Sequence, residues 1–138
     1  MKKLPPYREV RYAVLHHVGH GEPHYDLLIG REDEPLVTFR LPCWPVVSRV
    51  EITPLPDHRP LYLTYEGPVS GGRGEVRRVE AGTTGASPEW LREAGEQRVV
   101  VITPLERDGQ PLRRRLNELL RFTADRRQVE PVAHAHQG

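Results

Sequence analysis

Prolines and glycines divide this sequence into short segments. The chain of 138 residues contains 14 prolines and 12 glycines, and both residue types favour turns, because proline fixes φ and glycine tolerates positive φ. Between the turns lie short runs rich in apolar and β-branched residues, which predict strands at residues 12–15, 25–29, 36–41, 50–53, 61–65, 75–79 and 99–103. Short, frequent strands are typical of an antiparallel barrel or sandwich, so we expect a mainly β fold.

Other elements are expected from the turn and cap signals. Turns are predicted at residues 54–60, 68–74 and 108–111, where proline, glycine and aspartate cluster. Ser87 followed by Pro88 predicts the start of one short helix that ends at Gly95. The segment 112–122 carries leucines at helical spacing and favours a second helix, although the preceding Asp108–Gly109 pair is typical of a hairpin turn.

Length and composition predict a single domain over residues 1–122. Residues 123–138 are polar and lack a periodic apolar pattern, so we expect a flexible C-terminal tail, which includes His134 and His136. Cys43 is the only cysteine, which excludes an internal disulfide and a multi-cysteine zinc site. No apolar run approaches the roughly 20 residues of a membrane span, and no apolar leader follows Met1. We therefore expect a cytoplasmic protein without a membrane partner.

Arginine supplies nearly all of the positive charge. The net charge is only +1, but the basic residues are 18 arginines and two lysines. Guanidinium groups bind phosphate in a bidentate manner and stack on bases, so this composition is compatible with a nucleic-acid or phosphoester ligand. A GC-rich or heat-adapted genome is the alternative explanation.

Histidines are concentrated near the N-terminus. His16, His17, His20 and His24 precede Asp26, and on a strand His24 and Asp26 project from the same face. A third ligand from the preceding strand, His17 or alternatively His20, would complete a set of two histidines and one carboxylate. Such a set suits manganese or iron better than structural zinc.

A second chemical motif begins after the proline-rich segment. Asp57-His58-Arg59 is followed by Tyr62, which would share a face with His58 if the segment were extended. Histidine, arginine and tyrosine grouped so closely suit a phosphate site. The alternative is a turn with a capped histidine and a tyrosine packed at a sheet edge.

These two motifs carry a family resemblance. Residues 11–29 resemble the manganese-binding motif of the 3′-phosphoesterase domain of bacterial DNA ligase D, and residues 57–74 resemble that family's Asp-His-Pro…Tyr…Phe-Glu-Gly…Gly block. With a further match at residues 36–42, the resemblance covers roughly residues 11–84. The chain looks closest to the small stand-alone members, which have an Arg-Leu pair where Arg40-Leu41 stands here.

The resemblance implies a compact antiparallel β-barrel and a manganese-dependent phosphoesterase. Its expected role is in DNA repair and non-homologous end joining, where it removes a 3′-phosphate or a terminal 3′-ribonucleotide from DNA or RNA ends, as in a primer-template. A separate repair ligase or polymerase is then an expected partner. The family also implies strand rather than helix at residues 112–122.

The site residues follow by position. The resemblance implies that His17, His24 and Asp26 hold Mn²⁺ or another divalent metal, and that His58 and Tyr62 contact the scissile phosphate. To these we add arginines and one acid: Arg40 as a further catalytic residue, and Arg59, Arg73 and Glu66 as substrate contacts.

The sequence departs from the family in three respects: the N-terminal Arg-Asp…Glu segment is reduced to Arg8 and Glu9, the His17–His24 spacing is one residue longer, and one arginine is missing. An arginine two residues after the metal-binding aspartate is replaced by Leu28, which removes a phosphate-binding charge unless Arg40 or Arg59 supplies it. One alternative function is therefore a catalytically impaired module that binds nucleic-acid ends. Another is a non-heme iron oxygenase that uses His24, Asp26 and His58 as a facial triad.

Overall fold

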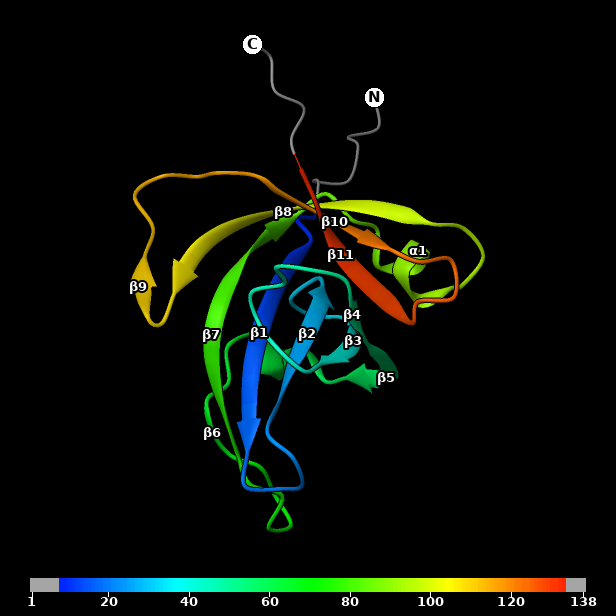
Figure 1. Ribbon diagram of the computed structural model, residues 1–138. Helices are drawn as coiled ribbons and strands as arrows, with labels where there is room; N and C mark the ends of the chain where they lie inside the picture. The colour runs from blue at the N-terminus through cyan, green and yellow to red at the C-terminus, as the bar shows by residue number, and fades with distance from the viewer. Residues whose placement is uncertain (1–7, 134–138) are drawn as a thin grey trace, which may run out of the picture.

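The structure is a computed structural model that describes residues 8–133 (Figure 1). The protein is mainly β and its strands pair antiparallel. The strands are β1 Arg11–Val18, β2 His24–Gly30, β3 Leu36–Leu41, β4 Val50–Glu51, β5 Thr53–His58, β6 Gly67–Pro68, β7 Glu75–Thr84, β8 Arg98–Arg107, β9 Gln110–Pro111, β10 Glu118–Phe122 and β11 Gln128–Val132. The helical elements are the 3₁₀ helix η1 Pro60–Leu63 and the α-helix α1 Pro88–Arg92.

One strongly curved sheet contains all of these strands (Figure 1). Its order is β4-β11-β10-β8-β7-β1-β2-β3-β5, with β6 and β9 pairing on β7 and β8. The two outermost strands, β4 and β5, are separated in the chain by Ile52 alone. The two ends of the sheet therefore meet through the chain, although no ladder between β4 and β5 closes a barrel within residues 8–133. The expectation of a mainly antiparallel β fold is correct. The term barrel applies only loosely, because the sheet is not closed within the described residues.

The first three strands bury apolar side chains on both faces. Tyr12 and Val14 of β1 belong to the larger core inside the curved sheet. Ala13 and Leu15 point the other way, into a second cluster that η1 covers with Leu63. The catalytic candidates lie beyond this second cluster, so tightly packed apolar side chains support the site from below.

Prediction of the strands is right for most of the sheet and wrong around η1. The predicted strands at 12–15, 25–29, 36–41, 75–79 and 99–103 lie within β1, β2, β3, β7 and β8. The predicted strand at 61–65 is wrong, because Pro60 occupies the first turn of η1. The predicted turn at 54–60 is mostly β5, an edge strand, where prolines are tolerated because no neighbour needs their N–H.

The C-terminal third corrects two further predictions. Residues 118–122 form β10 rather than a helix, since β10 pairs with both β8 and β11 and buries Leu120 and Phe122 on one face. These non-local ladders override the helical leucine spacing. The expected tail is wrong as far as Val132, because β11 joins the sheet. His134 and His136 lie outside the described residues.

The turn and helix signals hold in part. Asp108 and Gly109, at φ 49° and 79°, form the two-residue turn of the β8–β9 hairpin. Helix α1 starts at Pro88 as predicted, but ends at Arg92 rather than at Gly95. Across residues 8–133, neither helical element approaches the length or apolar character needed to cross a membrane.

Candidate metal centre and basic cavity

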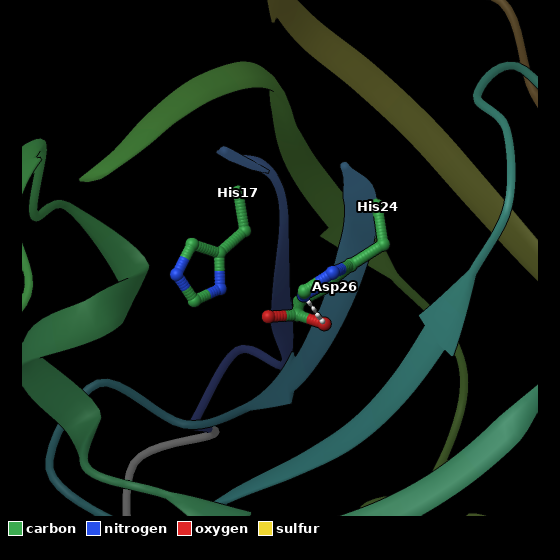
Figure 2. A group of neighbouring side chains, drawn as sticks. All are labelled: His17, His24 and Asp26. Carbon is green, nitrogen blue, oxygen red and sulfur yellow. Dashed lines mark ion pairs between the residues drawn. The ribbon is translucent and has the colours of Figure 1, made fainter. Parts of the chain in front are cut away.

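Three predicted metal ligands meet at one end of the β1–β2 hairpin. His17 and His24 are cross-strand partners, and Asp26 follows His24 on the same face of β2. One ligand atom from each residue lies within 4.8 Å of the other two (Figure 2). Gly19 and Gly21 adopt positive φ in the intervening turn, which lets the chain reverse without moving the two histidines apart. The hairpin thus produces the predicted arrangement.

Two backbone carbonyls fix the orientation of the imidazole rings. His17 Nε2 lies 2.6 Å from the carbonyl oxygen of Arg73, and His24 Nδ1 lies 3.0 Å from that of Glu22. Because a carbonyl only accepts, each of these nitrogens carries the proton in the neutral ring. The second nitrogen of each ring is then an acceptor, and in Figure 2 these nitrogens turn toward Asp26. Such carbonyl contacts commonly orient metal-binding histidines.

Two buried acceptor atoms face each other without a hydrogen bond. His24 Nε2 and Asp26 Oδ1 lie 3.5 Å apart, and neither has a hydrogen-bond partner within the described chain. His24 is 7% and Asp26 4% exposed, so water can replace the missing hydrogen bonds of these two atoms only poorly. Two ligands each about 2.1 Å from a shared ion, at an angle near 110°, are about 3.4 Å apart. The donor set therefore fits a divalent metal such as manganese, iron or zinc.

His20 occupies a different position from the three clustered residues. Its ring centroid lies 6.3 Å from that of His17, and the residue is exposed on the β1–β2 turn. Among residues 8–133, the potential ligand group consists of His17, His24 and Asp26 and leaves out His20 and His58. The facial triad expected for the oxygenase alternative, with His58 as third ligand, is therefore not assembled.

A cavity of about 470 Å³ opens beside these ligands. Its polar lining comes from five separated segments of the chain: His17, His20, Asp26, Arg40, Asp57, His58, Arg59, Tyr62 and Arg73. Its apolar wall includes Leu15, Leu55, Val69 and Val76. Most of the predicted site residues therefore share one space with the candidate metal ligands.

Arg40 is paired with Asp26, the candidate carboxylate ligand. It is the cross-strand partner of Asp26, with its Nε 3.8 Å from Asp26 Oδ1. This distance is too long for a hydrogen bond, and the side chain is 47% exposed. Arg40 can therefore move toward an anion in the cavity at low cost.

His58, Arg59 and Tyr62 form a second group across the cavity. His58 ends β5, and its Nδ1 lies 3.2 Å from the carbonyl oxygen of Pro56, which leaves Nε2 as the acceptor of the neutral ring. The His58 and Tyr62 ring centroids are 5.7 Å apart, and the Arg59 guanidinium lies 5.9 Å from the Tyr62 ring. The turn of η1, rather than an extended strand, brings Tyr62 beside His58.

Arg73 and Glu66 differ in their relation to the cavity. The Arg73 guanidinium lines the cavity and donates to Ser70 O at 2.8 Å and to Ser70 Oγ at 3.1 Å. Glu66 lies outside the cavity lining and accepts from the backbone N–H of Arg78 at 3.2 Å. The prediction of Glu66 as a substrate contact is therefore not supported by its position.

Leu28 continues the face of β2 that carries His24 and Asp26. Its side chain is fully buried in the second apolar cluster, which places no charge where the resembled family has arginine. The carbonyls of Glu22 and Arg73, which orient the two histidine rings, could not be found from the sequence. Every residue has a backbone carbonyl, and only the fold determines where it points.

Comparisons with known proteins assign no family. No protein-family model matches the chain, and a search of curated proteins finds no relative. The resemblance to the ligase D phosphoesterase domain therefore stays a prediction, and the function rests on the geometry.

We expect removal of Arg40 to strengthen metal binding. In Arg40→Gln the carboxylate of Asp26 loses a competing cation, and an exposed pair of this kind contributes about 0.2–1 kcal/mol. The Kd for Mn²⁺ should fall by up to about fivefold, measured by titration calorimetry, while the affinity for inorganic phosphate decreases. Arg31→Gln, which lies far from the ligands, is the charge-matched control. Unchanged or weaker metal binding in Arg40→Gln would contradict this competition.

Proposed function

We propose that the protein is a divalent-metal-dependent phosphoesterase that removes a 3′-phosphate or a terminal 3′-ribonucleotide from DNA or RNA ends. The observation that carries the proposal is the cluster of His17, His24 and Asp26, two of which, His17 and Asp26, line a cavity. The same cavity is lined by Arg40, Arg59, Arg73, His58 and Tyr62. Metal ligands and guanidinium groups facing one space suit a phosphoryl substrate, whose equatorial oxygens carry the charge.

Manganese is the metal we propose, and the neighbouring side chains bind the phosphate and transfer protons. The ion, when bound, supplies a Lewis acid beside the phosphate. Arg40, Arg59 and Arg73 bind the phosphoryl oxygens, and Arg40 replaces the charge that Leu28 lacks. Hydrolysis of a 3′-phosphate adds water to phosphorus and breaks the P–O3′ bond, and the O3′ oxygen takes up a proton. His58 Nε2, with Tyr62 beside it, is the acid or base for these proton transfers.

A module that binds ends without turnover is the second candidate. One observation favours it: Leu28 is packed into apolar side chains, so this position of β2 supplies no charge to the site. In that case Arg59 and Arg73 would still hold a terminal phosphate, and a separate repair ligase or polymerase would act on the end.

End processing by the wild-type protein separates the two candidates, and substitution of His58 tests the role proposed for that residue. With a 5′-labelled primer-template ending in a 3′-phosphate or a single 3′-ribonucleotide, wild-type protein and manganese should yield a 3′-hydroxyl end, and EDTA should prevent it. His58→Ala should reduce turnover about 100-fold or more, the usual contribution of a general acid or base, while the Mn²⁺ affinity is retained. The control is His16→Ala, because the His16 ring stacks on Tyr25 and lies outside the cavity lining.

Each result has a definite meaning. Full activity in His58→Ala would remove His58 from the reaction. Absence of product with wild-type protein, together with salt-sensitive binding of the ends, would support the binding module instead.

A further inference from the structure

Most described arginines are neutralised by carboxylates, and the exceptions gather in a few places. Arg59 and Arg73 line the cavity. Arg126 is buried and donates to backbone carbonyls, while Arg127 lies beside Asp125. The remaining exception is the run Arg113–Arg115, whose side chains form no hydrogen bond or ion pair within residues 8–133.

This run lies in the exposed loop 112–117 between β9 and β10 (Figure 1, orange). All three arginines are exposed. The acidic residues of the adjoining strands and turn are each already paired: Glu106 with Arg78, Asp108 with Arg77, and Glu118 with Arg107. The loop therefore presents three positive charges that no acid of the described chain neutralises.

The loop is anchored at both ends. Leu112 N–H donates to the carbonyl of Leu105 at 2.9 Å, next to the β8–β9 hairpin. Glu118 starts β10 opposite Ile102 of β8. Three like charges in sequence repel one another, and the anchored loop keeps them together at one place on the surface. Such an arrangement costs stability unless a polyanion neutralises it.

The position of the loop relative to the metal cluster follows from strand register. His17 lies opposite Val76 of β7. Pro104 lies opposite Gly82 of β7, and it is close to the start of the loop because its neighbour Leu105 accepts the hydrogen bond from Leu112. Six residues of strand separate the two levels, which is roughly 20 Å at about 3.3 Å per residue. Nucleotides of one strand in a helix are about 3.4 Å apart along its axis, so this distance corresponds to about six nucleotides of a helical strand and to fewer of an extended single strand.

We propose that loop 112–117 binds the sugar–phosphate backbone of the strand whose 3′ end occupies the cavity, up to about six nucleotides from that end. The inference rests on the proposed function and adds to it a substrate that extends well beyond the terminal group. The planar guanidinium group of arginine can donate two parallel hydrogen bonds to phosphate oxygens. Such a contact with the sugar–phosphate backbone is independent of base sequence. Substrates too short to reach the loop do not use it.

Binding to two lengths of DNA tests the inference. We would measure the affinity of a dinucleotide and of a 16-nucleotide single strand, both ending in a 3′-phosphate, in EDTA so that no turnover occurs. In R113Q/R114Q/R115Q the Kd for the 16-mer should rise about tenfold and its salt dependence should decrease, while the dinucleotide is bound as by wild type. R8Q/R11Q/R31Q loses the same charge elsewhere and should bind both lengths normally.

Lysine substitutions and other polyanions complete the test. R113K/R114K/R115K keeps the charge and should retain most of the 16-mer affinity, which separates a binding defect from a folding defect. An unchanged 16-mer affinity in the glutamine variant, equal losses for both lengths, or a similar loss in R8Q/R11Q/R31Q would overturn the inference. Equal loop-dependent binding of polyglutamate or of anionic vesicles would overturn the assignment to nucleic acid.

Failure of the loop and failure of the proposed function give different results. Loop-dependent binding of the 16-mer without any manganese-dependent product would support the loop and overturn the phosphoesterase. Turnover of the 16-mer that is insensitive to the loop would support the enzyme and overturn the distal contact.

Discussion

Asp26→Asn should lose both metal binding and turnover. The amide is nearly the same size as the carboxylate but has no charge, so His24 Nε2 would face a neutral group in a buried site. We expect the Mn²⁺ affinity to fall at least 100-fold and manganese-dependent end processing to fall to background. Titration calorimetry and electron paramagnetic resonance of free Mn²⁺ measure the first, and the primer-template assay measures the second.

A matched variant controls for the loss of one acid. Glu32→Gln removes an exposed carboxylate from the turn after β2 and should leave Mn²⁺ affinity and turnover unchanged. If Asp26→Asn bound manganese as wild type does, or if wild type bound none, the three residues would not form a metal centre. A proton shared by His24 and Asp26 would then account for their proximity.

Glu80→Ala should cause the largest loss of stability that we expect from a single substitution. The Glu80 side chain is 2% exposed, accepts from Tyr12 Oη at 2.7 Å and from Arg107 Nε at 2.7 Å, and lies in the middle of β7. Alanine leaves the buried Tyr12 hydroxyl without an acceptor and opens a cavity. We expect the free energy of unfolding to fall by about 3 kcal/mol, measured by urea denaturation. Glu75→Ala, an exposed position on the same strand, should change it by less than about 0.5 kcal/mol.

The same network makes stability depend on alkaline pH. Burial, reinforced by the neighbouring Glu80 carboxylate, raises the pKa of the Tyr12 phenol above its ordinary value of 10.0. The unfolded chain releases this proton near pH 10, whereas the folded protein keeps it. The Tyr12 contribution is therefore complete below about pH 10 and is lost as the pH rises above it. Tyr12→Phe is less stable at neutral pH but should show a smaller further loss between pH 9 and 11, and an equally steep loss would contradict this account.

The sequence determined the local features of the site. Alternation along a strand puts His24 and Asp26 on one face of β2, and the Gly19 and Gly21 turn returns the chain so that His17 faces them. Most strands were predictable because short apolar and β-branched runs lie between turn residues. β1, β2 and β3 are buried on both faces and form nearly continuous apolar runs, whereas β7 and β8 alternate. The Asp108–Gly109 hairpin was equally predictable, because positive φ at two successive positions favours those residues.

Only the tertiary structure decided the features that depend on distant partners. β10 is a strand because it pairs with β8, and β11 is a strand because it pairs with β10 and β4. The local spacing of leucines cannot indicate these distant pairings. The carbonyls of Glu22 and Arg73 that orient the histidines carry no side-chain signature. The separation of arginines into those neutralised by acids and those left free likewise depends on which strands pair. Local periodicity acts over a few residues, whereas ladders and ion pairs join residues far apart in the chain, so the fold alone brought them together.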